Sequence, residues 1–193
     1  MGYLPAPRTL RHAGCAGAHL NRRPLMRVAI ALGSNLDDRL ALLRRGRDRL
    51  RQIHDQDAPF LCSKIYETSP LDCPPGSPPF LNAVIELSTS LPPFDLLALM
   101  QKWESDFGRP SSHAHHAPRT IDLDILYCGS LHISHSMLTL PHPRIFERLF
   151  VLDPLCDICP DRKATPKSHS FRELRDILRS SQNRNLSSFI YDF

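Results

Sequence analysis

The sequence predicts an α+β fold in which helices pack on an antiparallel, ferredoxin-like sheet. The main observation is the order of the expected elements after residue 25: strand, helix, strand, strand, helix, strand, which is the βαββαβ order of that fold. A second is that 193 residues, 41% of them hydrophobic and 23% charged, suffice for one ordinary core. A third is that the chain has neither an internal repeat nor the glycine patterns of P-loop and Rossmann phosphate sites.

The first strand and helix are predicted from an apolar run and the turn that follows it. Residues 27–32 read RVAIAL and precede the turn residues 33–35 (GSN), a pattern typical of a buried strand. Either Asp37 or Asp38 can cap a helix over about 39–53, in which leucines recur on one face.

The middle of the chain predicts two more strands and a second helix. Residues 60–68 alternate between apolar and polar side chains, as in a half-buried strand. Five prolines in 69–79 indicate a stiff, extended loop. Residues 81–87 (LNAVIEL) predict the third strand, and a proline pair opens a helix over about 92–107 that a glycine ends.

The last third begins with a polar, histidine-rich loop over 109–120. Residues 121–127 (IDLDILY) alternate with period 2 and predict the fourth strand of the core. A short strand over 131–133 and short helices around 144–149 and 170–180 complete the expected elements.

The charge of the chain is unevenly distributed, although its net value is only +4. Residues 1–25 hold four arginines and no acid, so 26–193 holds 20 basic and 20 acidic residues. This balance argues against a nucleic-acid partner, and no apolar run approaches the ~18 residues of a membrane span. We expect 1–25 to be a disordered or non-native extension, with Met26 as a natural initiator, and 26–193 to be a single domain. An organellar targeting role of the extension stays open.

The six cysteines show no disulfide-framework spacing, and no secretory signal precedes them. Reduced thiols and a cytoplasmic location are therefore expected. Cys156 and Cys159 form a C-x-x-C motif without the second pair of ligands that a structural zinc site needs. We expect them to be plain structural thiols in a connection, 154–160, that follows the last core contact.

The residues with the clearest chemistry are Asp122 and Asp124. On a strand they share one face, about 6.6 Å apart along the chain, while Leu123 and Ile125 face the other side. Aspartate is depleted in strands, so two at this spacing need a reason. Oxygen ligands without thiolates suit Mg²⁺, and two metal ions could be bridged by such a pair. The alternative is an exposed face of an edge strand.

Basic side chains accompany these carboxylates. Arg119 lies three residues before Asp122, and arginine beside a metal-carboxylate site commonly holds a polyphosphate. Further along, His142 stands between two prolines that stiffen its backbone, and Arg144 and Arg148 follow. Each of these is a weak signal alone.

The stretch 116–126 (HAPRTIDLDIL) resembles the signature of the 6-hydroxymethyl-7,8-dihydropterin pyrophosphokinases of folate biosynthesis. Other blocks agree in order and spacing, and the resemblance covers about residues 26–178. These blocks are ALGSNL from Ala31, TSPL from Thr68, FLNA from Phe80, Gly108-Arg109, PHPR from Pro141 and ERLF from Glu147.

The resemblance implies an Mg²⁺-dependent enzyme that transfers pyrophosphate from ATP to the pterin and releases AMP. We expect the protein to be a monomer. By similarity, two Mg²⁺ ions are bound by Asp122 and Asp124, which act in catalysis with Arg109 and Arg119. The implied ATP contacts are Gln101, Glu104, Arg109, Arg119, Ile125, His142 and Arg148. The implied pterin contacts are Thr68, Leu71, Phe80, Asn82 and Phe150, and the chemistry agrees: two rings can sandwich a flat heterocycle while an asparagine amide reads its edge.

Two departures from the family pattern stand out. The loop 111–116 reads SSHAHH where more strongly basic or aromatic residues can occur, so its charge would depend on pH near 6.5. Ser69 and Asp72 stand where proline and glycine are frequent.

Three rival functions stay open at this point. An RNA-binding module of the same fold would need sheet aromatics in a K/R-G-F/Y-rich strand, and no strand has them. A regulatory domain would not need both aspartates. A degenerate relative that binds ATP but turns over poorly is not excluded by the sequence.

Overall fold

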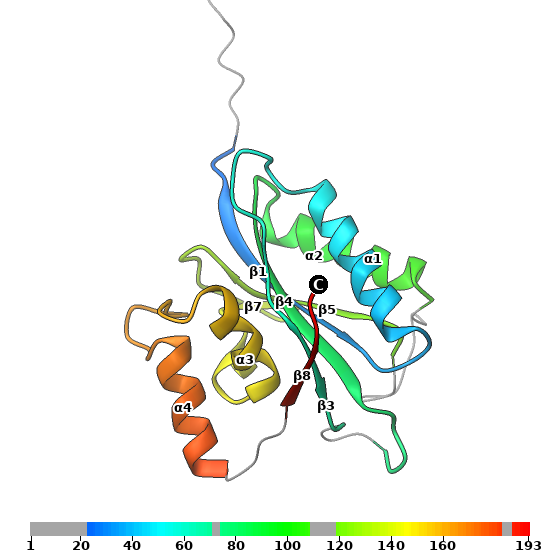
Figure 1. Ribbon diagram of the computed structural model, residues 1–193. Coiled ribbons are helices and arrows are strands. Elements are labelled where there is room, and N and C mark those ends of the chain that lie inside the picture. Colours follow the sequence, from blue (N-terminus) through cyan, green and yellow to red (C-terminus); the bar gives the residue numbers. More distant parts are fainter. Residues whose placement is uncertain (1–22, 71–73, 109–118, 183–186) are drawn as a thin grey trace, which may run out of the picture.

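The computed structural model of the protein describes residues 23–70, 74–108, 119–182 and 187–193 (Figure 1). The elements of the first half are β1 (Met26–Ser34), α1 (Arg39–Gln52), β2 (Leu61–Cys62), β3 (Ile65–Thr68), β4 (Phe80–Thr89) and α2 (Pro93–Asp106). Those of the second half are β5 (Asp122–Cys128), β6 (Ile133–His135), β7 (Leu138–Leu140), the 3₁₀ helix η1 (Pro143–Phe146), α3 (Leu149–Ile158), α4 (Phe171–Gln182) and β8 (Ser187–Tyr191).

The main sheet has the strand order β5-β1-β4-β3-β8, with β2 also pairing with β4, and all its pairs are antiparallel. The predicted βαββαβ core is confirmed, since β1, α1, β3, β4, α2 and β5 follow in that order. Strand β5, which carries the two aspartates, lies at one edge of the sheet, and β3 lies two strands away from β1. Strands β5 and β3 are therefore separated by β1 and β4, but all four strands contribute side chains to the same two faces of the sheet.

The helix boundaries follow local chemistry. The side chain of Asp38 accepts a hydrogen bond from the amide of Ala41 at 3.0 Å and so caps α1, whereas Asp37 takes a positive φ of 56° in the turn before it. Helix α2 has proline in its first turn, where an amide would lack a partner, and Gly108 follows it with a φ of 89°.

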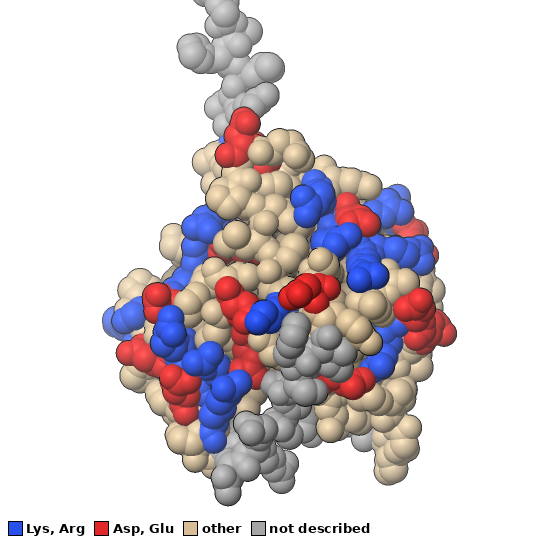
Figure 2. All heavy atoms as spheres, viewed as in Figure 1, with Lys and Arg blue, Asp and Glu red and all other residues tan. Residues whose placement is uncertain are grey.

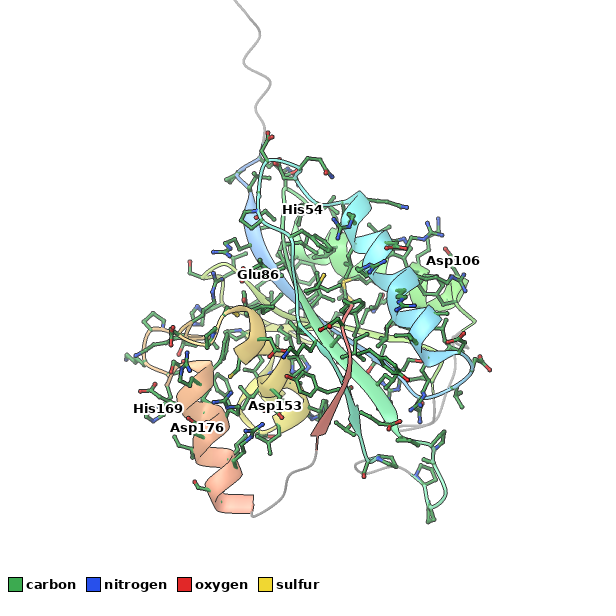
Figure 3. The ribbon with its side chains drawn as sticks, in the orientation of Figure 1. His54, Glu86, Asp106, Asp153, His169 and Asp176 are labelled. Atoms are coloured by element: carbon green, nitrogen blue, oxygen red, sulfur yellow. The ribbon has the colours of Figure 1, made fainter. Side chains whose placement is uncertain are left out.

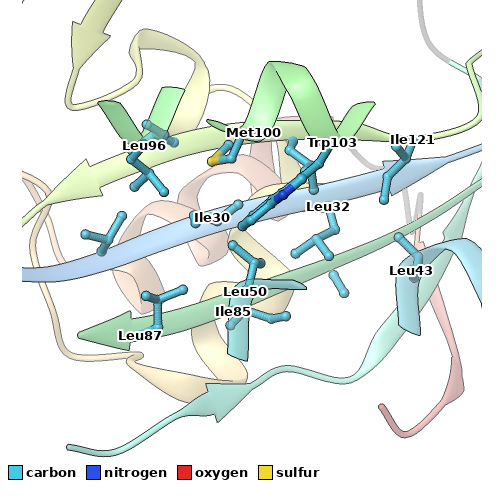
Figure 4. Packing of buried hydrophobic residues seen from close by; sticks show 14 of the residues in the cluster. Ile30, Leu32, Leu43, Leu50, Ile85, Leu87, Leu96, Met100, Trp103 and Ile121 are labelled. Carbon is cyan, nitrogen blue, oxygen red and sulfur yellow. The ribbon is translucent and has the colours of Figure 1, made fainter. Parts of the chain in front are cut away.

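One face of the sheet packs against α1 and α2 (Figures 1 and 4). Alternate residues of β1, β4 and β5 supply this first core, and Figure 4 shows Trp103 and Met100 of α2 lying over Ile30 of β1. Gly46 permits the close approach of α1, because a Cβ there would lie 2.9 Å from Ile121 Cδ1.

The opposite face divides into two halves. Ala29, Val84, Leu126 and Tyr127 form a second core there with residues of α3 and Phe171 of α4. Towards the other end of the same strands, the register places Gly33, Asn82 and Asp122 side by side. This face thus supports two helices with one half and presents small and polar side chains with the other.

Several expectations for individual elements were wrong. The expected strand 60–68 is interrupted, because the Ser63 hydroxyl accepts a hydrogen bond from the Val84 amide at 2.9 Å and so takes a place in the ladder between β2 and β3. The short strand expected at 131–133 is instead a hairpin of β6 and β7, and the helix expected at 144–149 is η1 followed by α3. Strand β8 was not expected.

The segment 154–160 is not a connection beyond the core. It contains the end of α3, and Cys156 and Cys159 pack against the second core. Burial raises the pKa of Cys156 to about 11, and burial also raises the pKa of Cys159, so both thiols stay protonated. Within the described ranges, no group of three or more metal-ligating residues is found.

The helices of the described residues include none that is long and apolar enough to span a membrane. Figure 2 shows acidic and basic side chains interspersed over the face viewed, consistent with the balanced charge of 26–193.

Candidate active site

The two aspartates stand on the polar half of the sheet face. Leu123 and Ile125 are almost wholly buried in the first core, and their burial turns Asp122 and Asp124 to the opposite face, where both remain partly exposed. Asp122 pairs in register with Gly33 of β1. The predicted alternation along β5 is thus confirmed.

Arg119 reaches back to the first aspartate. Its Nη1 donates to Asp122 Oδ2 at 2.5 Å, and the two side chains are 20% and 24% exposed. Its Nε is buried with no hydrogen-bond partner in the described part of the chain. A buried guanidinium donor without a partner is costly, so an anionic oxygen bound here would satisfy it.

Asn35 holds Arg119 in place, a role that the sequence did not reveal. Its side-chain oxygen accepts from the Arg119 amide at 2.8 Å, its backbone amide donates to the Arg119 carbonyl at 3.2 Å, and its Nδ2 donates to the Pro78 carbonyl at 3.3 Å. The turn after β1 is thereby tied to the approach to β5 and to the proline-rich loop. The available signal was an asparagine directly after a buried strand.

His142 lies against the same edge strand. Its amide donates to the Leu126 carbonyl at 2.8 Å, and its Nδ1 accepts from the Arg144 amide at 3.2 Å, which leaves the proton of the neutral ring on Nε2. Burial, then the charges of Arg148 and Arg144, lower the pKa of His142, against the opposing pull of Asp122. At neutral pH the ring is therefore an uncharged donor near the aspartate.

The residues implied for pterin binding meet the aspartates at Gly33. The Asn82 amide donates to Thr68 Oγ1 at 2.8 Å, and Phe80 pairs in register with Thr68. A Cβ added to Gly33 would lie 3.3 Å from Asn82 Oδ1, 3.9 Å from Asp122 Cβ and 4.0 Å from Phe80 Cδ1. The small space in front of Gly33, too narrow for a methyl group without displacement of Asn82, is therefore bordered by both groups of residues.

Phe150 and Arg148 come from the start of α3. Arg148 is the N-cap residue, and its guanidinium carbon lies 5.2 Å from the centre of the Phe150 ring. Phe150 is partly buried against the second core. The helix that supports the second core thus begins with a cation lying over a ring, and that cation is close enough to His142 to lower its pKa.

Three further implied ATP contacts lie on β5 and α2. The side chain of Ile125 is buried in the first core, on the face opposite Asp124, so a contact of this residue with ATP would have to come from its backbone at the sheet edge. Glu104 is buried, and its Oε1 accepts from the Leu123 amide at 2.7 Å. Gln101 is exposed on α2. Leu71, Arg109 and the loop 111–116 lie outside the described residues.

Comparison with known proteins identifies the family. Residues 29–160 match the family described as 7,8-dihydro-6-hydroxymethylpterin-pyrophosphokinase (HPPK). The chain belongs to this family. A 2-amino-4-hydroxy-6-hydroxymethyldihydropteridine pyrophosphokinase of Bacillus subtilis is 45% identical over 130 residues, which cover 67% of this chain and 76% of that protein. One of the same name from Pseudomonas aeruginosa is 35% identical, covering 75% and 88% of the two chains.

Other similar proteins are longer than this chain. A mitochondrial folate synthesis bifunctional protein of Pisum sativum is 38% identical over 149 residues, which cover 75% of this chain and 28% of that protein. A crystal structure of a Plasmodium falciparum HPPK-DHPS triple mutant with pteroate matches with a TM-score of 0.65 at 13% identity, covering 90% of this chain and 48% of that one. At this identity the likeness supports the ferredoxin-like fold alone.

Proposed function

We propose that the protein transfers a pyrophosphoryl group from ATP to the hydroxymethyl group of 6-hydroxymethyl-7,8-dihydropterin. The observation that carries this proposal is the meeting at Gly33 of Asn82 and Phe80, which suit a flat heterocycle, with Asp122, which suits a metal-bound polyphosphate. The hydroxymethyl oxygen bonds to the β-phosphorus and releases its proton to solvent. The bond from that phosphorus to the oxygen bridging the α- and β-phosphates breaks, and AMP leaves with that oxygen.

Mg²⁺ is the metal that the donors fit best. Asp122 and Asp124 supply hard carboxylate oxygens from one strand face, and no larger ligand cluster surrounds them within the described ranges. Mg²⁺ commonly takes one or two carboxylates and fills its remaining positions with water and substrate phosphates. When bound, it would neutralise phosphate charge and align the reacting oxygens, and the family resemblance suggests two ions.

The surrounding side chains would complete the ATP site. Arg119 has a buried, unsatisfied Nε that can donate to a phosphate oxygen, and neutral His142 can donate through Nε2. Arg148 adds a fixed cation at the start of α3. Phosphoryl transfer needs mainly positioning and charge neutralisation from a protein, and these groups can supply both.

The pterin would lie between Phe80 and Phe150, with its polar edge on Asn82. Because Nδ2 of Asn82 already donates to Thr68, the orientation of the amide is fixed, with Oδ1 directed towards the space at Gly33. A donor on the pterin edge can then bond to that oxygen. A monomeric state and a cytoplasmic location stay predictions.

The deciding experiment is identification of the product. The full chain is incubated with Mg-ATP and 6-hydroxymethyl-7,8-dihydropterin, and the nucleotides are separated by ion exchange, with Asp122→Ala as the control. Pterin-dependent AMP that the variant does not form supports the proposal. Formation of ADP would mean a simple kinase, and bound ATP or pterin without turnover would favour a degenerate relative.

A further inference from the structure

Tyr66 and Asp157 join two elements that are far apart in the sequence. The Tyr66 hydroxyl lies 3.0 and 2.9 Å from the two carboxylate oxygens of Asp157, to which it donates, and the amide of Lys64 donates to Asp157 Oδ2 at 3.0 Å. Burial and then the bond to Asp157 raise the pKa of Tyr66, so the phenol keeps the proton that it donates. One carboxylate of α3 thus holds both a side chain and the backbone at the start of β3.

The strand side of this contact leads directly to the pterin residues. Tyr66 pairs in register with Asn82, and Thr68, two residues further along β3, pairs with Phe80. Side chains two residues apart on a strand share a face, so Tyr66 and Thr68 lie on the face that carries Asn82. Any shift of Tyr66 would be transmitted to the Thr68 hydroxyl that orients the Asn82 amide.

The helix side leads to the other wall of the proposed pocket. Asp157 follows Phe150 by seven residues, which is about two helical turns, so the two side chains share one side of α3 about 10 Å apart. Asp153 lies between them, and its Oδ1 accepts from Arg179 of α4 at 2.7 Å; Figure 3 shows it on α3 near the α3–α4 boundary. The side of α3 that carries Phe150 is therefore fixed at two points, one to the sheet and one to α4.

We propose that Tyr66 and Asp157 are a positioning pair that sets the distance between Phe150 and the Asn82–Thr68 pair, and so tunes affinity for the pterin rather than for ATP. This inference rests on the proposed function, because it assigns the pterin to that space. Without the contact, α3 and β3 would sample a range of separations, and pterin binding would have to order them. Asp122 and Asp124 on β5 lie beyond β1 and β4 from β3, so the metal-phosphate half is not held by this contact.

Two single substitutions and their combination test the pair. Tyr66→Phe removes one hydroxyl and keeps the ring, and Asp157→Ala removes the acceptor. Matched controls make the same chemical changes elsewhere: Tyr191→Phe at an exposed tyrosine of β8, and Asp161→Ala at a surface ion pair with Arg172. Pterin affinity is measured by calorimetry in the presence of Mg²⁺ and a non-hydrolysable ATP analogue, and the KM values for both substrates come from AMP formation.

We expect each single variant to weaken pterin binding by about threefold to tenfold, the range for the loss of one ordinary hydrogen bond, because this contact is exposed. The KM for ATP should change by less than about twofold. The double variant should be no weaker than the weaker single variant, because both remove the same contact. Pterin affinity equal to that of the controls, additive losses, or equal losses for ATP and pterin would overturn the inference. Tyr66→Phe decides the matter alone if Asp157→Ala does not fold. A wild-type chain that forms no pterin-dependent AMP would instead refute the proposed function.

Discussion

Replacing Gly33 with alanine places one methyl group at the centre of the proposed site. Gly33 lies in β1 between Asn82 of β4 and Asp122 of β5, and its backbone φ is not in the left-handed region, so alanine is allowed there. The new Cβ would lie 3.3 Å from Asn82 Oδ1, which is closer than ordinary van der Waals contact. The substitution therefore perturbs the site without requiring a new backbone conformation.

The effect on function should exceed the effect on folding. Alanine in a strand interior gains about 0.5–1 kcal/mol over glycine, which offsets part of the overpacking cost of about 1–3 kcal/mol. We expect a net change in the free energy of unfolding of no more than about 2 kcal/mol. The Asn82 amide cannot move away freely, because its hydrogen bond to Thr68 holds it at 2.8 Å. The added methyl group should therefore displace Asn82 Oδ1 from its proposed hydrogen bond with the pterin and lower kcat/KM for the pterin by about tenfold to a hundredfold.

The assay compares AMP formation at varied pterin concentration with the melting temperature of each protein. Gly129→Ala is the matched control: it adds the same methyl group at a φ of 54°, with no atom within 4 Å, just beyond the far end of β5. This control should lose about 1 kcal/mol of stability through backbone strain but keep its KM for the pterin. If Gly33→Ala retained wild-type kcat/KM for the pterin, the pterin would not occupy the space at Gly33.

Three further predictions concern the metal, the second half of the sheet face and pH. Removal of Mg²⁺ by a chelator should abolish AMP formation reversibly while leaving the circular dichroism spectrum unchanged, and Asp124→Asn should lower kcat by at least about a hundredfold at saturating Mg²⁺. Glu86 is 1% exposed and binds Arg27, Arg162 and the Tyr127 hydroxyl. Because both arginines are partly exposed, Glu86→Gln should lower the free energy of unfolding by about 1–2 kcal/mol, which is a fall of about 3–6 °C in melting temperature. The KM values should not change. Burial lowers the pKa of His142 in the folded chain, so as pH falls through about 6.5 the unfolded chain binds more protons than the folded chain, and the free energy of unfolding decreases. Urea titrations from pH 7.5 to 5.5 should show a smaller decrease for His142→Gln than for the wild type. An identical decrease would contradict this assignment.

The sequence predicted the core of the fold because its signals there are local and periodic. Alternation along 121–127 placed Asp122 and Asp124 on one face, and the proline pair and Gly108 bounded α2. It did not predict α3, since Pro154 interrupts the pattern and cannot donate the hydrogen bond to residue 150 that a helix would use. Burial of Leu152 and Leu155 against the sheet stabilises this helix despite that loss.

The parts of the site that depend on distant contacts could not be read from local patterns. Asn35 binds Arg119 across 84 positions and Tyr66 binds Asp157 across 91. Strand β8 has only five residues (SSFIY) and pairs with the edge of β3, a partner more than a hundred residues earlier. Each case requires the fold to be known before the residue's role becomes visible.

One face of the sheet is divided into two halves, so the same strands carry both the residues that stabilise the fold and the residues of the proposed site. Asn82 and Glu86 lie on the same face of β4 only four residues apart, yet Asn82 orients towards the space at Gly33 while Glu86 is enclosed by Arg27, Arg162 and Tyr127. Helix α3 spans the boundary, since its apolar side chains complete the second core and its first residues present Arg148 and Phe150. A helix that is anchored in the second core therefore begins with the ring and the cation that we propose to contact the ligands. This is why contacts of α3 that lie far from the aspartates, such as that of Asp157, are expected to influence ligand affinity.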